Sequence, residues 1–240
     1  MKKSIDRIHS IYRCYKDFDV KIIEGVDGVS LWCDGSVDDF NRYNWDIEKL
    51  NNLINNGIIE TWYKDFGDAR PPDIACNVSQ RNAIADFYNS DEDIGIIIED
   101  DTCPLKGLAD FKMPKDVDFY CLLGTDHPGH RVATYDNGEI KYLRNLSGYA
   151  ITKKCAELAM DAIVPFWNIV DIQLSFSLFQ SVEIGNTLPN FWKRRTTIKA
   201  MAPQKSLIGL SDMALNTTCT DTGKKKWMPK GWDSIPYQSV

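Results

Sequence analysis

Three adjacent acidic residues, Glu99, Asp100 and Asp101, form the most informative chemical group in the sequence. They follow residues 94–98, of which four are isoleucine. A β-branched run of this kind is typical of a strand that is buried on both faces in the middle of a parallel sheet. Ligands of open α/β sheets bind outside the carboxyl ends of the strands. We therefore expect the acidic run to face a ligand.

A divalent cation would offset the repulsion between these three carboxylates. Oxygen ligands of this kind suit Mg²⁺ or Mn²⁺, which often keep water and phosphate oxygens as their other ligands. We expect Asp101 and Glu99 to hold the metal, and Asp100 and Glu99 to orient the metal or a nucleotide donor. In the alternative interpretation, Asp100 and Asp101 only stabilise the turn after the strand.

Asp171 is the first candidate for a general base, because apolar residues surround it in the sequence from 166 to 172. It is an equally good candidate for the N-cap of the helix that follows it. His127 and His130 lie three residues apart in a Pro/Gly-containing loop after a predicted strand. They are candidates for contact with phosphate or acceptor, or weakly for a metal, but they also fit an ordinary exposed loop.

Alternating strands and helices must position these residues. The hydrophobic pattern predicts helices over residues 3–15, 46–55, 74–89, 153–163 and 169–180. It predicts strands over residues 20–23, 94–98, 119–123 and 146–151, and a hairpin around Asp136-Asn137-Gly138. This order favours a layered α/β domain with a mostly parallel central sheet flanked by helices.

Four blocks of the sequence, taken in order, resemble the LPS-type glycosyltransferases (the glycosyltransferase 25 group). They are residues 20–28, which end in Val26-Asp27-Gly28; residues 76–80; residues 96–101; and residues 148–152 with Ala156 and then Val170-Asp171. The likeness extends over about residues 5 to 208. Two features depart from the family. Almost nothing precedes Asp6-Arg7, where the family has an apolar strand, and Gln80 stands where the family often has histidine.

The resemblance implies a GT-A-type fold and transfer of a sugar from a nucleotide-sugar donor with the help of Mn²⁺ or Mg²⁺. It places Arg7, Asp27 and Gln80 beside Glu99 and Asp100 on the donor side, with Asp100 and Asp171 in catalytic roles. Gly148 and Tyr149 belong to the acceptor side. We expect a single GT-A-like catalytic domain over residues 1–190, with a basic, tryptophan-containing segment over residues 191–240 packed on it.

That C-terminal segment contains two basic runs, residues 193–195 and 224–226, and the second adjoins Trp227. Interleaved basic and aromatic residues can grip phosphates and stack on bases or sugars, although such a run is usually just a solvated surface. The net charge of −6 and a pI of about 5.1 disfavour binding to nucleic acid through bulk charge. The acceptor is therefore left open between a glycan or lipopolysaccharide sugar and a hydroxymethylated base in phage DNA.

The sequence contains no apolar run of the ~20 residues that a membrane-spanning helix needs. Its seven scattered cysteines, without a C-x-x-C pair, fit a reducing compartment. We therefore expect a cytoplasmic protein without integral membrane contact, in the host cytoplasm if it is viral. Two other functions stay open: a non-catalytic protein that kept the fold and binds a nucleotide sugar or glycan, and a metal-dependent phosphoesterase.

Overall fold

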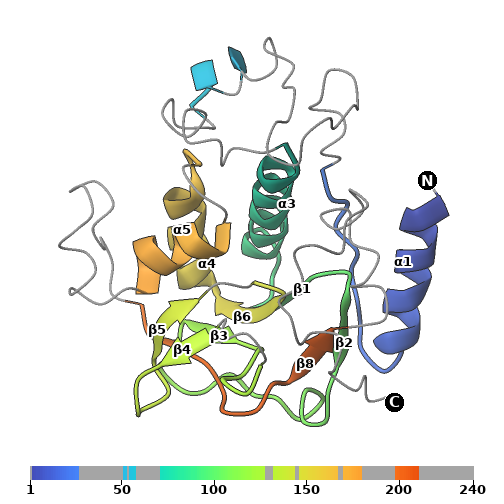
Figure 1. Cartoon of the computed structure of the whole chain (residues 1–240), viewed down its shortest axis with the longest axis vertical. Coiled ribbons are helices and arrows are strands. Elements are labelled where there is room, and N and C mark those ends of the chain that lie inside the picture. The colour runs from blue at the N-terminus through green and yellow to red at the C-terminus, as the bar shows by residue number, and fades with distance from the viewer. Residues whose placement is uncertain are drawn as a thin grey trace, which may run out of the picture.

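The computed structural model describes residues 2–26, 51–52, 54–57, 71–127, 132–143, 146–166, 170–179 and 198–210. These residues form a mixed α/β fold (Figure 1). The α-helices with full bounds are α1 (Lys2–Cys14), α3 (Pro71–Tyr88), α4 (Lys153–Ile163) and α5 (Val170–Leu174), and a π-helical turn, η3 (Ser175–Phe179), continues α5. The expected α/β class is confirmed.

A four-stranded mixed sheet lies at the centre, in the order β1-β6-β3-β7. Its strands are β1 (Ile94–Ile98), β6 (Gly148–Thr152), β3 (Phe119–Cys121) and β7 (Ala200–Met201). β6 is antiparallel to both β1 and β3, whereas β7 is parallel to β3. β1, β3 and β7 therefore point the same way, and their carboxyl ends share one edge of the sheet with the start of β6.

The expectation of a mostly parallel sheet needs correction, because β6 separates β1 from β3 and leaves one parallel pair among the three pairs described. The expectation that β1 is buried on both faces is also wrong. β1 has a neighbour on one side in the described sheet, and Ile94 and Ile96 are 44% and 48% exposed. A run of isoleucines indicates β propensity, but it does not show which elements cover each face of the strand.

Helices α3, α4 and α5 cover one face of the sheet (Figure 1). Pro71 begins α3, where its missing N–H costs nothing. At the other end of this helix the ammonium group of Lys153 donates to the carbonyl oxygens of Phe87 (2.7 Å) and Tyr88 (2.8 Å). Lys153 thus caps α3 from the first turn of α4 and ties the two helices together.

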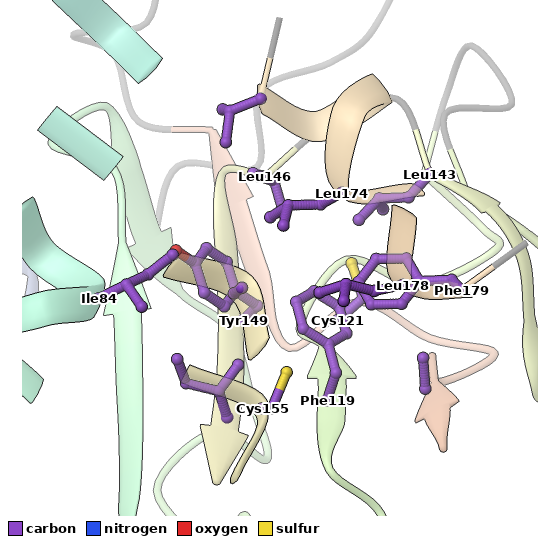
Figure 2. Packing of buried hydrophobic residues seen from close by; sticks show 14 of the residues in the cluster. Ile84, Phe119, Cys121, Leu143, Leu146, Tyr149, Cys155, Leu174, Leu178 and Phe179 are labelled. Carbon is purple, nitrogen blue, oxygen red and sulfur yellow. The ribbon is translucent and has the colours of Figure 1, made fainter. Parts of the chain in front are cut away.

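The core lies between these helices and the sheet. The ring of Phe119 stacks on Tyr149 with the centroids 5.3 Å apart, and it contacts Phe179 at 4.5 Å. Figure 2 shows these rings together with aliphatic side chains from α3, α5 and η3. Phe119, Tyr149 and Phe179 come from three elements far apart in the sequence, so they fix the sheet and helices in one arrangement.

Two smaller pairs of strands flank the sheet. β4 (Val132–Thr134) and β5 (Ile140–Leu143) form the expected hairpin, with Gly138 in its turn at φ +81°. β2 (Thr102–Pro104) pairs antiparallel with β8 (Ile208–Leu210) beside α1 (Figure 1). Residues 198–210 of the expected C-terminal segment therefore contribute β7 to the sheet and β8 to this pair.

The predicted strand over residues 20–23 is wrong. Residues 19–26 have no regular secondary structure, and they lie against α3. Lys21 pairs with Asp86 at 2.7 Å, and the backbone N–H of Val26 donates to the Ser79 hydroxyl at 2.8 Å. Within the described ranges, no helix is long and apolar enough to cross a membrane.

Candidate functional site

The acidic run lies at the sheet edge that the sequence predicts. Glu99 follows directly on β1, and its backbone N–H donates to the carbonyl oxygen of Ser147 at 2.8 Å. Ser147 precedes β6, whose first residue is opposite Ile98 in the register. The end of β1 and the start of β6 therefore fix the backbone of Glu99 before any side chain contributes.

A chain of two hydrogen bonds, which begins in the core at Tyr149, orients the Glu99 side chain. The Tyr149 hydroxyl donates to Oε1 of Gln80 at 2.8 Å, and Nε2 of Gln80 donates to Oε1 of Glu99 at 3.4 Å. In Figure 2 the Tyr149 hydroxyl oxygen points toward α3, the helix that carries Ile84 and Gln80. Because the Tyr149 hydroxyl donates to the amide oxygen of Gln80, the amide N–H₂ of Gln80 is turned toward the carboxyl of Glu99.

The electrostatics of Glu99 reflect this enclosure. Glu99 keeps a little accessible surface, but protein surrounds its carboxyl group. Burial above all, together with the negative charges of Asp101, Asp100 and Asp171, raises the pKa of Glu99 from 4.5 to about 7. A hydrogen bond from the Ser147 side chain opposes part of this shift. Proton or cation binding at this edge would relieve the repulsion.

Helix α3 also brings Asp171 to the same edge. Oδ1 of Asn77 accepts a hydrogen bond from the backbone N–H of Val170 at 2.8 Å, which holds the start of α5 against α3. Asn77 and Gln80 are three residues apart on α3, so they lie on neighbouring positions of one helix face. Asn77 holds the residue before Asp171, and Gln80 holds Glu99. The two carboxyl groups are close enough for the charge of Asp171 to raise the pKa of Glu99.

The local geometry of Asp171 bears on both of its predicted roles, general base and stabiliser of the helix start. Its side chain is buried, with 9% of the residue exposed, and its Oδ1 accepts from the backbone N–H of Ile172 at 2.8 Å. Asp171 is the second residue of α5, so this contact satisfies an N–H of the first turn from inside the helix and not from the N-cap position. The proximity to Glu99 fits a group at a reaction centre. Base and cap therefore both remain as predictions.

Asp100 has a different partner from its neighbours. Both of its carboxylate oxygens accept from Nη1 of Arg7, at 2.7 and 2.9 Å. Arg7 lies on α1, so this ion pair ties the N-terminal helix to the acidic run. The structure thus places Arg7 at the sheet edge where the sequence predicts binding of a nucleotide-sugar donor. There Arg7 forms an ion pair with Asp100.

The donor set at this edge consists of oxygen atoms, which suits Mg²⁺ or Mn²⁺. Among side chains in the part of the chain that the structure describes, no group of three or more histidine, cysteine or acidic residues is arranged to hold a metal. Mg²⁺ commonly binds through one or two carboxylates together with substrate phosphates and water. Glu99 and Asp101 fit that mode, in which the substrate supplies the remaining ligands.

The predicted acceptor contacts of Tyr149 and Gly148 need correction. Tyr149 has no exposed surface, because its ring stacks in the core and its hydroxyl holds Gln80. A Cβ on Gly148 would collide with Ile208 and would lie 3.2 Å from Ile98. Gly148 is therefore required for close packing of β6. Gln80 likewise acts on Glu99 and is itself 7% exposed, so it is a positioning residue.

His127 is buried, and its backbone N–H donates to the carbonyl oxygen of Gly124 at 3.1 Å. It lies in the loop that follows β3, at the shared carboxyl edge. Asp27, His130 and Trp227 lie outside the described residues, as do the basic runs 193–195 and 224–226.

Sequence reasoning missed two residues that build the site. Asn77 is fully buried on α3, and Ser147 is 2% exposed just before β6. For Asn77 the sequence does contain a signal, which is a polar amide among the apolar residues of a predicted helix. A buried amide needs hydrogen-bond partners outside its own helix, so such a residue is a candidate for a contact with another element. Nothing in the sequence marks Ser147, since its contact with Glu99 depends on the pairing of β1 with β6.

No protein-family model matches this chain, and no curated protein is significantly similar to it.

Proposed function

We propose that this chain is a metal-dependent glycosyltransferase that moves a sugar from a nucleotide-sugar donor to an acceptor hydroxyl in the cytoplasm. The observation that carries the proposal is the convergence of Glu99, Asp101 and Asp171 at the carboxyl edge of the sheet, from β1 and from α5. A GT-A-type fold belongs to the same proposal, supported by the acidic run at the end of a strand in a mixed α/β sheet.

Each residue has a defined task in this proposal. Glu99 and Asp101 hold the cation, which when bound offsets the charge of the departing diphosphate. Gln80 keeps the carboxyl of Glu99 turned toward the edge. Arg7 supplies positive charge beside the run through its contact with Asp100. Asp171 takes the proton from the acceptor hydroxyl. The acceptor is a glycan or a hydroxymethylated base in DNA.

A binding protein without catalysis is the second candidate. The ion pair between Arg7 and Asp100 favours it, because that pair neutralises one of the three adjacent carboxylates. Both candidates predict binding of a nucleotide sugar, and only the enzyme releases the nucleoside diphosphate.

The test measures free nucleoside diphosphate released from a panel of nucleotide sugars, with Mn²⁺ or with EDTA, by the full chain. The enzyme releases it from at least one donor in Mn²⁺, slowly to water and faster with a suitable acceptor. Release that EDTA leaves unchanged contradicts the metal role. A donor that stabilises the chain to heat without any release decides for the binding protein.

A further inference from the structure

A polar hollow of about 290 Å³ lies away from the acidic run, between the loop after β3, the turn of the β4–β5 hairpin and the segment after β7. Side chains that face it include Thr125, Thr134, Tyr135, Asp136 and Gln204. Tyr135 is 38% exposed, one of the few large hydrophobic side chains at the surface of the described residues. None of these residues has a part in the site at Glu99.

Backbone hydrogen bonds hold the three walls of this hollow together. The N–H of Thr125 donates to the carbonyl oxygen of Pro203, and the N–H of Ala202 donates to that of Gly138, both at 3.1 Å. The hairpin turn is closed by the N–H of Gly138, which donates to Tyr135 at 2.9 Å. Because main-chain bonds between distant segments build the hollow, its shape is present before a ligand arrives.

The chemistry of the lining suits a neutral sugar. Hydroxyl, carboxylate and amide groups of Thr125, Thr134, Asp136 and Gln204 can donate to and accept from the hydroxyls of a sugar. Tyr135 adds an amphipathic ring of the kind that packs on apolar C–H faces. Of the described residues that line the hollow, none is basic, and Asp136 would repel a phosphate. Lys141 lies close by, with its ammonium group 5.7 Å from the Tyr135 ring centre.

The hollow shares the sheet edge with the acidic run. Thr125 follows β3 and Gln204 follows β7, and both strands point the same way as β1. β7 is three positions from β1 in the sheet, so the usual strand spacing separates these two strands by about 14 Å. The hollow lies beyond the ends of β3 and β7, on the far side of β6 from the acidic run. A ligand that reaches from one to the other must be longer than a single sugar ring.

We infer that this hollow is an acceptor subsite for a neutral oligosaccharide, which it holds by one sugar unit while the end that receives the new sugar lies near Asp171. This inference rests on the proposed transferase function and selects a glycan acceptor over DNA. Tyr135 is the residue on which recognition depends most, with Asp136 next.

The test compares wild-type protein with Tyr135→Ala, Tyr135→Phe and Asp136→Asn on an array of neutral oligosaccharides. Tyr12→Ala is the matched control, because Tyr12 is a 54% exposed tyrosine on α1. We expect binding by wild-type protein, Tyr135→Phe and Tyr12→Ala, and roughly tenfold weaker binding by Tyr135→Ala. Release of nucleoside diphosphate to water should be equal in all of them, because that reaction needs only the donor site.

Equal binding by Tyr135→Ala and wild-type protein overturns the subsite, as does an array on which wild-type protein binds no neutral oligosaccharide. A Tyr135→Ala defect that appears on hydroxymethylated duplex DNA instead of on glycans also overturns it. If no donor is hydrolysed but the Tyr135-dependent glycan binding persists, the transferase proposal fails and the hollow remains a glycan-binding site. Melting temperatures of the variants separate a local loss of contact from unfolding.

Discussion

At the scale of single residues, the behaviour of Glu99 depends on neighbours from three different segments. Gln80 on α3 orients its carboxyl, Ser147 before β6 binds it, and burial with the charges of the acidic run raises its pKa to about 7. A free glutamate would be ionised at neutral pH, whereas Glu99 lies near the midpoint of its titration. Cation binding and proton binding should therefore compete at this residue.

The first prediction is a pH dependence of stability that Glu99→Gln removes. In the folded protein Glu99 holds a proton up to about pH 7, while in the unfolded chain it loses the proton near pH 4.5. The folded state thus binds more protons between these values, so the free energy of unfolding falls as pH rises through this window. At about 1.4 kcal/mol per pKa unit, the loss is on the order of 3 kcal/mol.

Urea unfolding between pH 5 and pH 8 measures this effect. Glu99→Gln should flatten the profile and make the protein more stable at pH 8 than the wild type. Glu92→Gln is the control, because Glu92 is exposed in the turn before β1 and should leave the profile unchanged. Mn²⁺ should raise the melting temperature of the wild type more at pH 8 than at pH 5. A Glu99→Gln profile that matches the wild type contradicts this account of Glu99.

The second prediction separates the two roles of Asp171. Asp171→Asn keeps the oxygen that accepts from Ile172 but removes the basic carboxylate. If Asp171 is the base, turnover falls by roughly 10²–10⁴ while the melting temperature and donor affinity change little. If Asp171 is only a cap, Asp171→Asn is nearly normal, and Asp171→Ala lowers stability by about 1 kcal/mol. Asp161→Asn, on the exposed side of α4, is the control for turnover.

At the scale of elements, α3 organises the site. Its buried polar side chains Asn77 and Gln80 hold α5 and Glu99, and its C-terminal end is capped by Lys153 from α4. α3 can approach β1 closely because residue 95 is glycine. A Cβ at that position would lie 2.5 Å from the ring of Phe87. The distance between α3 and β1 thus sets where Gln80 meets Glu99.

The third prediction follows from this close approach. Gly95→Ala should destabilise the protein by about 1–3 kcal/mol, because the added methyl group overpacks Phe87 against β1. It should also weaken Mn²⁺ binding, because α3 must shift and carry Gln80 away from Glu99. Urea unfolding and Mn²⁺ titration measure the two effects.

Gly209→Ala is the matched control for Gly95→Ala. Its new methyl group would lie 3.4 Å from Leu105, an ordinary contact, and residue 209 is in β8 away from α3. A Gly95→Ala protein as stable as Gly209→Ala would show that α3 has room to move.

At the scale of the whole molecule, the elements that depend on local sequence signals are the ones that can be predicted. The helix expected over residues 74–89 after the Pro71-Pro72 break is α3. The isoleucine run predicts β1, and Asp136-Asn137-Gly138 predicts the β4–β5 hairpin. At the end of the helix predicted over residues 46–55, the described residues 54–57 show the expected stop, with Gly57 at φ +68°. In each case the residues whose contacts determine the element are only a few positions apart in the sequence.

What escaped prediction depends on distant contacts. The short strand β7 exists because residues 200–201 meet β3 about 80 positions earlier in the chain, and no local pattern records that pairing. The exposure of Ile94 and Ile96 likewise depends on distant contacts, because these residues lie on the face of β1 opposite the one that Gly95 turns toward α3. Within the site, the sequence predicted that Glu99 and Asp171 belong together. It did not predict that Tyr149 and Gln80 support Glu99 from inside the core.

The most direct test of the account measures nucleoside diphosphate release by Asp101→Asn in Mn²⁺, with the donor that the wild type hydrolyses best. This substitution keeps the volume of Asp101 and removes one charge from the crowded edge. Asp110→Asn is the control, because Asp110 is exposed away from the acidic run. The account predicts that Asp101→Asn melts no lower than the wild type and releases no nucleoside diphosphate above background, while Asp110→Asn is fully active. Full activity of Asp101→Asn would contradict the claim that the end of β1 holds the metal.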